Sequence, residues 1–466
     1  MLIDTLSFNE SKFYLLIGIL YSILSVFLIA QFSSSPIVIA LLVTLPLFLS
    51  LSFNFKLIEY TFIISLFVNL FISGLYLSVY VVALLLFSFF LVYRDISFNF
   101  FNTPISKAIL IYLLSVIPSL INSSKIFLSF FLMSNLIAFI VLVLVIGYST
   151  KNLSEISRII YFFVLMTFLD ALVIIIRSIG GNLRIFGFSG VVFADFSSLT
   201  IIFLLITLLF KDKEQYLKRF IKSAGILLLL STMIITQTRN SFITLLLSFL
   251  FIILFLFFNK KYLQKGARKV LLTLFGFLII ITTSILIINI YNPKVFGRFE
   301  ELGKTNTIQI KSEGDFGRSS LFTRLLIWDT AINAFKKHPF IGIGAFSFPF
   351  ESKEYYTISK ILYREYVQGL SPHIGYLAVL TETGIIGLVG FFFLLYSIIK
   401  MNYKALKLSK TSAERHISFS LLSFQVFIIF SLVFTDAWLW GQCGMLWGLL
   451  VGLSIANYKL LMNNVD

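Results

Sequence analysis

Four polar side chains beside or within apolar runs are the chain's main candidates for chemistry. Arg239 lies in TQTRNSF between two apolar runs, and Arg324 begins RLLIWDTA in the longest polar stretch. His373 opens SPHIGYLAVLTETGIIGL, in which Glu382 follows about two helical turns later. A guanidinium group grips phosphate oxygens through paired hydrogen bonds, and an imidazole titrates near neutral pH. In so apolar a chain, function must come from the few polar residues.

The composition indicates that the bilayer is the main solvent. Of 466 residues, 59% are hydrophobic and 12% are charged, against about 25% charged in soluble domains. The mean hydropathy of +0.99 excludes an ordinary soluble protein. Basic cytoplasmic loops explain the net charge of +16, so no nucleic acid is expected as a partner. The single cysteine, Cys443, excludes an intramolecular disulfide, and no Cys/His cluster has metal spacing, so neither metal nor cofactor is expected.

We predict an all-α fold, a polytopic membrane helical bundle of about 14 transmembrane helices with one large outer-face loop. A hydrocarbon core about 30 Å thick needs roughly 20 apolar residues of helix, and charges or Gly, Pro, Asn and Ser clusters separate such runs. All should be helical, because irregular backbone cannot satisfy its own polar groups in lipid. The predicted spans are residues 13–30, 36–53, 57–73, 75–93, 105–121, 126–148, 159–176, 191–210, 220–235, 242–258, 270–291, 374–399, 417–434 and 439–457.

The charge of the connections orients these spans. Alternate connections carry the basic runs KDKEQYLKR, NKKYLQKGARK and KMNYKALKLSK, which the positive-inside rule assigns to the cytoplasm. Both termini are then cytoplasmic, and the first apolar run is expected to stay as an anchor because no cleavage site follows it. The expected organisation is transmembrane helices 1–11 in residues 1–291, an extracytoplasmic (periplasmic) loop in 292–373, and transmembrane helices 12–14 in 374–466.

The long loop contains a predicted helix and a turn. Its stretch RLLIWDTAINAFKKHPF has apolar residues at helical spacing, which predicts an amphipathic helix lying on the membrane-embedded body. The Gly-rich sequence HPFIGIGAFSF follows directly. The loop therefore looks ordered rather than like a flexible linker.

Taken in order, these motifs resemble the O-antigen ligase and O-antigen polymerase superfamily of polytopic membrane glycosyltransferases. The resemblance rests on the Arg in TQTRNSF, on R-x-x-x-W before a P-[FL]-x-G-x-G turn, and on a Pro-His pair opening a helix with E-x-G-x-x-G, over residues 236–388. The family often has Asn after the His, and this chain has Ile374, so a polar role of that Asn has no counterpart here. The resemblance implies the bacterial cytoplasmic (inner) membrane, with the active site on the outer face.

Members of this superfamily move a glycan from an undecaprenyl-diphosphate carrier to a sugar hydroxyl, and this chain shows no need for a metal. The resemblance implies an undecaprenyl-diphosphate-linked glycan donor, a glycan or lipid A core acceptor, and membrane lipids as partners; binding of a chain-length regulator stays open. Arg239 and Arg324 would bind the diphosphate, and His373 would polarise or deprotonate the acceptor hydroxyl. Alternatively, the arginines snorkel to headgroups or pair with an acid such as Asp329, and His373 caps the following helix.

Other residues of the motifs have two interpretations each. Glu382, within an apolar helix, either orients His373 or an arginine or is hydrogen-bonded between helices. Gly342 and Gly344 permit close approach to a glycan or phosphate, or form a purely structural turn. Arg298, in VFGRFEEL, is a third candidate for substrate binding.

Five more polar or aromatic residues are not assigned to the site. His416 follows a cytoplasmic basic run, on the wrong side of the membrane for the site. His338 could serve in the loop, but its position before Pro339 favours packing at a turn. Asp170 is a carboxylate within the seventh span, and its role stays open. Asp436 and Trp438 fall at the outer end of the last two spans, where a Trp is usually an interfacial belt residue.

Two function classes compete. Within the transferase class, a polymerase attaches a growing chain to the next carrier-linked repeat, and a ligase attaches the finished chain to a lipid A core sugar; the span count and long loop favour the polymerase. The alternative is a transporter or flippase of lipid-linked glycans. Transporters often have internal repeats and polar residues near the membrane midplane, whereas this chain has no detectable repeat and its polar constellation lies at the outer surface.

Overall fold

The computed structural model describes residues 55–68, 71–72, 75–76, 78, 81–82, 85–86, 105–179, 185–210, 216–236, 238–259, 276, 320–439 and 441–463. The predicted spans at 13–30 and 36–53 lie outside these residues, as do most of the span at 75–93 and nearly all of the span at 270–291. The candidate Arg298 also lies outside them.

Helices make up almost all of the described chain. Up to residue 259 they are α3 (Phe55–Phe67), α5 (Ser106–Val116), η2 (Ile117–Asn122), α6 (Ile126–Leu132), α7 (Ser134–Ser149), α8 (Leu153–Ser178), η3 (Gly190–Val192), α9 (Phe193–Phe210), α10 (Tyr216–Thr236) and α11 (Arg239–Phe258). After residue 319 they are α14 (Ser320–Lys337), α15 (Phe348–Glu351), η8 (Ser352–Glu354), α16 (Lys360–Tyr366), α17 (Gly375–Leu408), α18 (Ser412–Ser431), η9 (Ala437–Leu439) and α19 (Gly441–Asn463).

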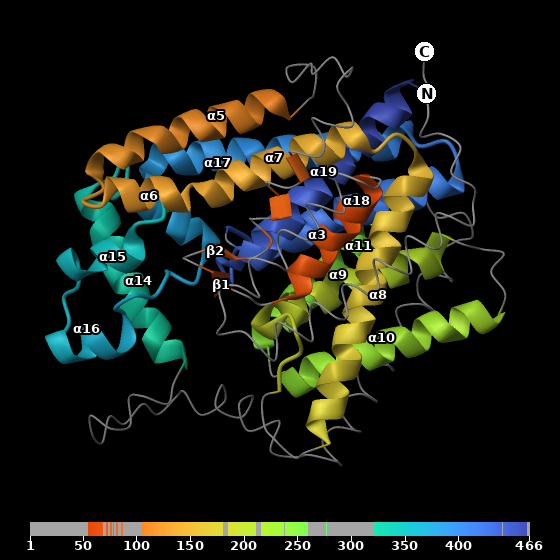
Figure 1. The fold of residues 1–466 in the computed structure, drawn as a ribbon, viewed down its shortest axis with the longest axis horizontal. Coiled ribbons are helices and arrows are strands. Elements are labelled where there is room, and N and C mark those ends of the chain that lie inside the picture. The colour runs from red at the N-terminus through yellow and green to blue at the C-terminus, as the bar shows by residue number, and fades with distance from the viewer. Residues whose placement is uncertain are drawn as a thin grey trace.

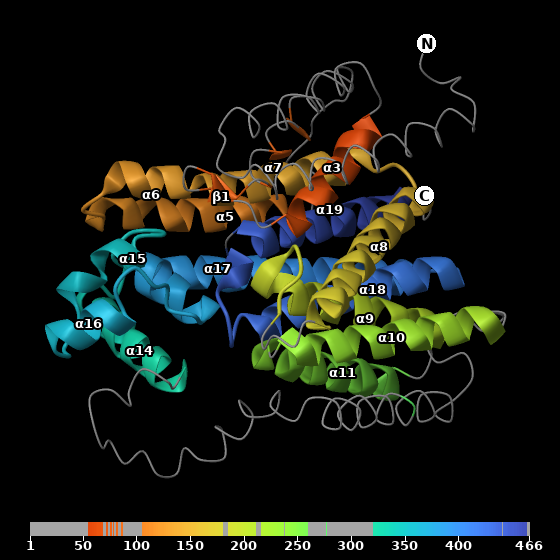
Figure 2. The same cartoon turned by 60° about the horizontal axis from the view of Figure 1, so that its bottom comes forward.

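The long helices form a bundle with a small helical cap at one end. Helices α5, α7, α17 and α19 run along its long axis, and α8 crosses it obliquely (Figure 1). Helices α9, α10 and α11 lie together beside α18 (Figure 2). Helices α14, α15 and α16 lie at one end, beside the start of α17. We call this end, formed by residues 320–374, the loop end.

Seven helices in the described part of the chain are long and apolar enough to cross a membrane. They confirm seven predicted spans and give the chain the helix composition of a multi-pass membrane protein. These helices are Ile126–Ser149, Leu153–Ser178, Gly190–Phe210, Tyr216–Thr236, Arg239–Phe258, Gly375–Leu408 and Gly441–Asn463.

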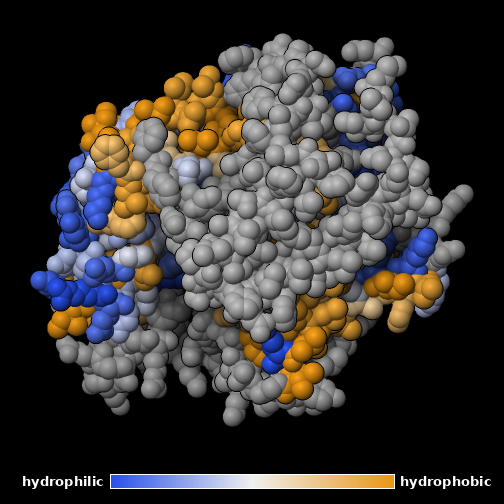
Figure 3. All heavy atoms as spheres, viewed as in Figure 1, coloured by the Kyte–Doolittle hydropathy of each residue, from blue (hydrophilic) through white to orange (hydrophobic). Residues whose placement is uncertain are grey.

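Small residues allow helices inside the bundle to pack closely, and apolar side chains cover its outer surface. Helix α19 packs along α7, where a Cβ on Gly452 would lie only 2.8 Å from the Ile146 side chain. Small residues at helix crossings allow this close approach in membrane proteins. Outward-facing side chains are apolar: Leu114 of α5 is 56% exposed, and the surface over α5 and α6 is correspondingly hydrophobic (Figure 3).

Three predicted spans need correction. The helix expected over 57–73 ends at Phe67, and strand β1 (Phe71–Ile72) pairs antiparallel with β2 (Leu75–Tyr76). The span expected at 105–121 is α5 followed by the 3₁₀ helix η2, because Pro118 in the first turn of η2 has no N–H for an α-helical bond. Helix α18, expected as 417–434, runs from Ser412 to Ser431 instead and is not among the seven, because its first turns carry the polar residues Glu414, Arg415 and His416.

The loop end has its own hydrophobic core. The predicted amphipathic helix forms as α14, and buried Ile327 and Ala331 on one of its faces pack with Phe348 and Tyr363 from α15 and α16. Hydrophilic atoms gather over this end of the molecule (Figure 3). This second core fixes α14 as a rigid element against the start of α17.

Candidate functional site

Three predicted residues converge at the loop end around a fourth, Asp436. Arg239 is the first residue of α11, Arg324 lies on α14, and His373 lies just before α17. Burial lowers the pKa of Arg324, the Asp436 carboxylate opposes this shift, and the Arg239 guanidinium adds to it. The charges of Asp436 and Arg324 also act on His373. The four side chains therefore share one electrostatic environment, although they come from four separate parts of the chain.

Asp436 contacts both the backbone and the ring of His373. The backbone N–H of His373 donates to Asp436 Oδ2 at 3.3 Å. The Nδ1 atom of the imidazole lies 3.9 Å from Asp436 Oδ1, which is too long for a hydrogen bond and short enough for a strong charge interaction. The side chain of His373 is 37% exposed and that of Asp436 is 7% exposed. The carboxylate is thus buried behind an imidazole that remains accessible.

The environment of His373 favours the neutral imidazole. Burial lowers the pKa of His373 below its ordinary value, Asp436 raises it, and Arg324 lowers it. The net direction is downward, so the environment favours the basic, unprotonated form of the ring over the imidazolium. A neutral imidazole can accept a proton from a hydroxyl, and the adjacent carboxylate then stabilises the cation that forms.

His373 adopts a backbone conformation that residues with a Cβ rarely adopt. Its φ angle is 57°, in the left-handed region. The residue before the first turn of α17 is Ile374, with extended backbone and no side-chain cap. Among the described residues, the imidazole makes no capping hydrogen bond to α17, so the capping alternative for His373 is wrong. Such strain is often found at functional sites.

The first turn of α11, which carries Arg239, is held from two sides. The side-chain amide of Asn240 donates to the carbonyl of Phe434 at 3.0 Å, two residues before Asp436. The hydroxyl of Ser241 donates to Asp195 Oδ1 at 2.9 Å, on buried α9. These bonds fix the start of α11 beside the segment that carries the carboxylate.

Helix α17 is broken at Gly384, and the Gly-rich turn fills the break. Gly384 has φ 66° and ψ −167°, a combination open only to glycine. The N–H groups of Ile385 and Ile386 donate to the carbonyls of Pro339 and Phe340, at 2.9 and 3.2 Å. In return, the Ile343 and Gly344 N–H groups donate to the carbonyls of Thr381 and Glu382, at 3.1 and 3.0 Å. The motifs P-F-I-G-I-G (339–344) and E-T-G-I-I-G (382–387) are thus joined by backbone hydrogen bonds in both directions. We call this paired unit the joint.

Glu382 holds this joint together. Its carboxylate accepts the backbone N–H of Phe346 at 3.0 Å and that of Phe348 at 3.3 Å. Among the described residues, no hydrogen bond joins Glu382 to His373 or Arg324. Both hydrogen-bond partners are backbone N–H groups, one in the Gly-rich turn and one at the start of α15. These contacts match neither interpretation from the sequence, which were the orientation of His373 or an arginine and a hydrogen bond to a neighbouring span.

The two glycines of the turn lie inside the joint. A Cβ on Gly342, at φ 70°, would lie 2.3 Å from the carbonyl carbon of Glu382. A Cβ on Gly344, at φ 116°, would lie 2.7 Å from the side chain of Ser123. Close backbone packing therefore accounts for both glycines, which agrees with the structural interpretation of this turn.

Polar residues of η2 and of the connection from η2 to α6 contact the other side of the turn, and sequence reasoning missed these contacts. Asn122 donates to the carbonyl of Gly342 at 2.8 Å, and the Ala345 N–H donates to Ser119 Oγ at 3.0 Å. Glu351 accepts the N–H of Ser124 at 3.0 Å. The Pro and Asn-Ser-Ser sequence there indicated a loop, but nothing in it indicated which turn it would contact.

The remaining polar residues have structural partners. His338 packs edge-on against Tyr355 at the turn, as predicted. His416 lies 2.7 Å from the Thr207 hydroxyl and is buried among helices. Asp170 accepts the N–H groups of Phe188 and Ser189 at 2.6 and 3.2 Å, so it anchors the connection that leads into α9.

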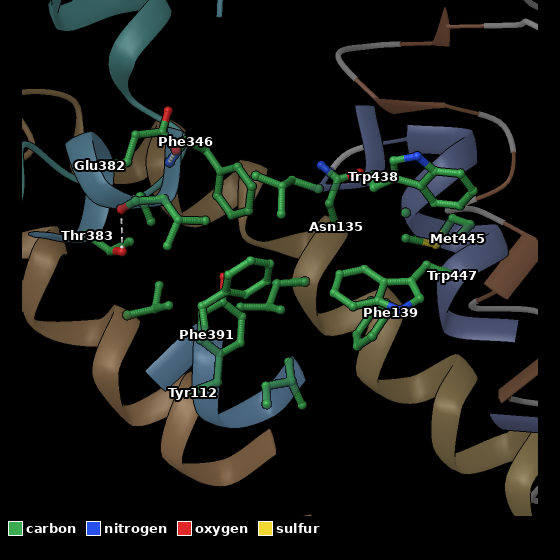
Figure 4. Close-up of a pocket in the computed structure, with 17 residues that line it drawn as sticks. Tyr112, Asn135, Phe139, Phe346, Glu382, Thr383, Phe391, Trp438, Met445 and Trp447 are labelled. Atoms are coloured by element: carbon green, nitrogen blue, oxygen red, sulfur yellow. Dashed lines mark hydrogen bonds between the residues drawn. The ribbon is translucent and has the colours of Figure 1, made fainter. Parts of the chain in front are cut away.

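Trp438 lies inside the bundle beside a cavity, so the expectation that it is an interfacial belt residue is wrong. It is fully buried and donates through Nε1 to the Ser431 hydroxyl at 2.9 Å, so it is not a belt residue facing headgroups. A cavity of about 40 Å³ lies beside it, between α5, α7, α17 and α19, with Phe346 and Glu382 at one end (Figure 4). Its wall is largely apolar and includes the aromatic side chains of Tyr112, Phe139 and Trp447. The cavity has room for only a few water molecules.

Asp436 is the functional candidate that sequence reasoning left without a role. The available signal was an acid in the connection between α18 and α19, which the predicted topology assigns to the same side as His373. The sequence alone gave no reason to pair the two. Among the residues that the structure describes, no three His, Cys, Asp or Glu side chains form a metal-binding group.

Comparison with known proteins supports the motif-based resemblance. The family model described as O-antigen ligase matches residues 224–392, from α10 to the middle of α17. The match includes Arg239, Arg324, His373 and Glu382, and it ends before Asp436. It confirms that this segment is similar to that family. None of the curated proteins compared with the chain matches it.

Proposed function

We propose, on the premise of this O-antigen ligase segment, that the protein transfers a glycan from an undecaprenyl-diphosphate carrier to a hydroxyl of a sugar acceptor. The reaction would occur at the loop end, which we assign to the outer face of the cytoplasmic membrane. The observation that carries the proposal is the convergence of Arg239, Arg324 and His373 around the buried Asp436. This grouping combines a binding site for a diphosphate with a base.

The two arginines suit the leaving group. When the bond between the anomeric carbon and the phosphate oxygen breaks, the diphosphate leaves with the electron pair and its negative charge grows. Guanidinium groups can hold phosphate oxygens through paired hydrogen bonds and stay charged in a partly buried site. Arg324 and Arg239 lie close enough for mutual repulsion to lower the pKa of Arg324. An anionic ligand between them would relieve that repulsion.

His373 suits the acceptor. Its imidazole would take the hydroxyl proton while the hydroxyl oxygen bonds to the anomeric carbon, and Asp436 would stabilise the resulting imidazolium. The energy for transfer is already stored in the diphosphate linkage of the donor, so no nucleotide is needed. The catalytic assignment is therefore Arg239 and Arg324 on the diphosphate and His373 on the acceptor, with Asp436 as its support.

Three predicted substrate-site residues receive different roles in this proposal. Glu382 maintains the joint between α17 and the Gly-rich turn, and thereby the placement of α14. Gly342 and Gly344 belong to the same joint. The carrier lipid must bind elsewhere than the aromatic cavity, because about 40 Å³ cannot hold a prenyl chain.

The acceptor decides between the two reactions. A polymerase uses another carrier-linked repeat and a ligase uses lipid A core, and the same residues serve either hydroxyl. We retain the polymerase as the first candidate and the ligase as the second.

The test is a transfer assay with purified components. The protein in lipid nanodiscs is incubated with an undecaprenyl-diphosphate-linked oligosaccharide, with EDTA and without nucleotide, and products are followed by mass spectrometry. A ladder of longer carrier-linked glycans supports a polymerase, and transfer only after lipid A core is added supports a ligase. Both should be lost in Arg324→Ala and His373→Ala.

The matched control is Arg415→Ala. Arg415 bonds to the Ser409 carbonyl at 3.3 Å, between α17 and α18 and away from the loop end, so transfer should persist. Carrier-linked substrate that stays unchanged with both acceptors, in a folded protein, would refute the transferase and leave the flippase as the alternative to test.

A further inference from the structure

The indole of Trp328 contacts the residue before His373. Its Nε1–H donates to the carbonyl of Pro372 at 3.0 Å. The bond joins α14 to the segment that leads into α17, across 44 residues of sequence. Trp328 is partly buried, and nothing in its sequence position indicated this contact.

The carbonyl of Pro372 and the N–H of His373 belong to the same peptide unit. Trp328 holds the carbonyl end of that unit, and Asp436 Oδ2 accepts its N–H at 3.3 Å. Because a peptide unit is planar, two opposed hydrogen bonds fix its orientation. The orientation matters because the backbone of His373 is in the left-handed conformation, at φ 57°. This conformation is unfavourable for a residue with a Cβ, so other contacts must hold it.

Trp328 also links the base to the diphosphate site. Arg324 and Trp328 are four residues apart on α14, so they lie on the same face of the helix, one turn apart. Helix α14 is held rigid by its own core. One helix turn therefore carries the guanidinium that would bind the leaving group and the indole that fixes the backbone of the base.

We infer that Trp328 is a positioning residue, which clamps the 372–373 peptide unit together with Asp436 and so holds the His373 imidazole at a fixed place relative to Arg324. This inference rests on the proposed function for its kinetic consequence. The clamp itself concerns only the backbone and ring of His373. Without the indole N–H, the peptide unit can rotate, and the imidazole leaves its partly buried position.

The test compares two substitutions that remove the same chemical group. Trp328→Phe keeps an aromatic ring and removes the N–H that bonds to Pro372. Trp447→Phe removes an equivalent bond, from Nε1 to Gln425 Oε1 at 2.9 Å, inside the bundle. Each variant is purified in nanodiscs, and its folding is checked by thermal melting. Two readouts follow: steady-state glycan transfer, and an NMR titration of histidines labelled with ¹⁵N.

The clamp predicts a specific change in kcat. Trp328→Phe should lower kcat about tenfold, the usual scale for one lost hydrogen bond, with KM for the donor within about twofold because Arg324 is unchanged. Trp447→Phe should keep both constants. Equal kcat in Trp328→Phe and the unmodified protein, or an equal fall in Trp447→Phe, overturns the inference.

The NMR titration tests the clamp without any glycan. The chain has three histidines, and the signal of His373 is identified by its loss in His373→Ala. Burial is the main cause that lowers the pKa of His373, so release of the ring in Trp328→Phe should move that pKa upward, toward the ordinary value. An unchanged titration overturns the clamp. A shifted titration in a protein that transfers no glycan supports the clamp and overturns the proposed function instead.

Discussion

Replacing Asp436 with asparagine removes one negative charge beside His373 and changes little else. The new amide oxygen can still accept the N–H of His373, which donates to Asp436 Oδ2 at 3.3 Å. Side-chain volume is almost unchanged. The substitution therefore separates the charge of Asp436 from its part in holding the backbone.

The separation of the charges sets the size of the effect. Two unit charges 3.9 Å apart interact by roughly 1 kcal/mol in water and roughly 4 kcal/mol at an effective dielectric constant of 20. Solvent screens this pair because the side chain of His373 is 37% exposed, so we take about 1 to 1.5 kcal/mol. One pKa unit corresponds to about 1.36 kcal/mol. Removal of the carboxylate should therefore lower the pKa of His373 by an amount that a titration can measure.

The direction follows from the causes of the shift. Burial lowers the pKa of His373 and Asp436 raises it, so removal of the carboxylate lowers the pKa further. A neutral imidazole acts as the base, so the acid limb of kcat/KM should move toward lower pH in Asp436→Asn. At pH 7.5 the rate should fall about tenfold, because the imidazolium formed during proton transfer loses its counter-charge.

The assay is the pH dependence of kcat/KM for glycan transfer between pH 4.5 and 8.5, for Asp436→Asn and a control. The control is Asp329→Asn, which changes an exposed carboxylate of α14 that bonds to Thr357 at 2.7 Å. Its pH profile should match that of the unmodified protein. An acid limb in Asp436→Asn that stays in place, or moves to higher pH, would show that His373 is not the base or that Asp436 does not act on it.

Three further outcomes are expected from the joint and the diphosphate site. Gly384→Ala should melt at a much lower temperature, because at φ 66° its Cβ would lie 2.3 Å from the carbonyl carbon of Phe340. The control Gly369→Ala also has a positive φ, 77°, but its Cβ would have no atom within 4 Å, so it should lose only about 1–2 kcal/mol of unfolding free energy. Equal losses in the two variants would contradict the packing argument. Glu382→Gln should also lower the melting temperature, while kcat/KM of the folded protein stays within about threefold; a large loss of activity at unchanged stability would instead assign Glu382 to the chemistry. Arg324→Lys keeps the charge and loses the bidentate fork, so KM for the carrier-linked donor should rise about tenfold or more in steady-state transfer, and an unchanged KM would remove Arg324 from the diphosphate site.

Much of the candidate site could be predicted because its motifs are local. The arginine in TQTRNSF, the R-x-x-x-W stretch and the Pro-His pair are each short sequences that resemble one family, and the family model matches the segment that contains them. The prediction of Glu382 as an aid to catalysis is not supported by its contacts, which are backbone groups of a turn. An acid in an apolar helix has several compatible partners, and spacing along the chain does not choose among them.

The sequence by itself determined the membrane environment, the seven described spans that it predicted and the amphipathic helix α14, because hydropathy and helical periodicity depend on residues within one or two turns of each other. The sequence also contains the cause of the change from α5 to a 3₁₀ helix, because Pro118 lacks an N–H, although the predicted span at 105–121 did not include this change. These features need no knowledge of the rest of the fold.

Only the tertiary structure decided which residues meet. The break at Gly384 is stable because carbonyls of a turn more than 40 residues earlier accept the freed N–H groups. Asp436 reaches His373 because the connection between α18 and α19 packs against the start of α17, where the Gly375 N–H donates to the Leu432 carbonyl at 2.8 Å. Such bonds join residues far apart in sequence, and their energies depend on burial and orientation, which no local pattern encodes.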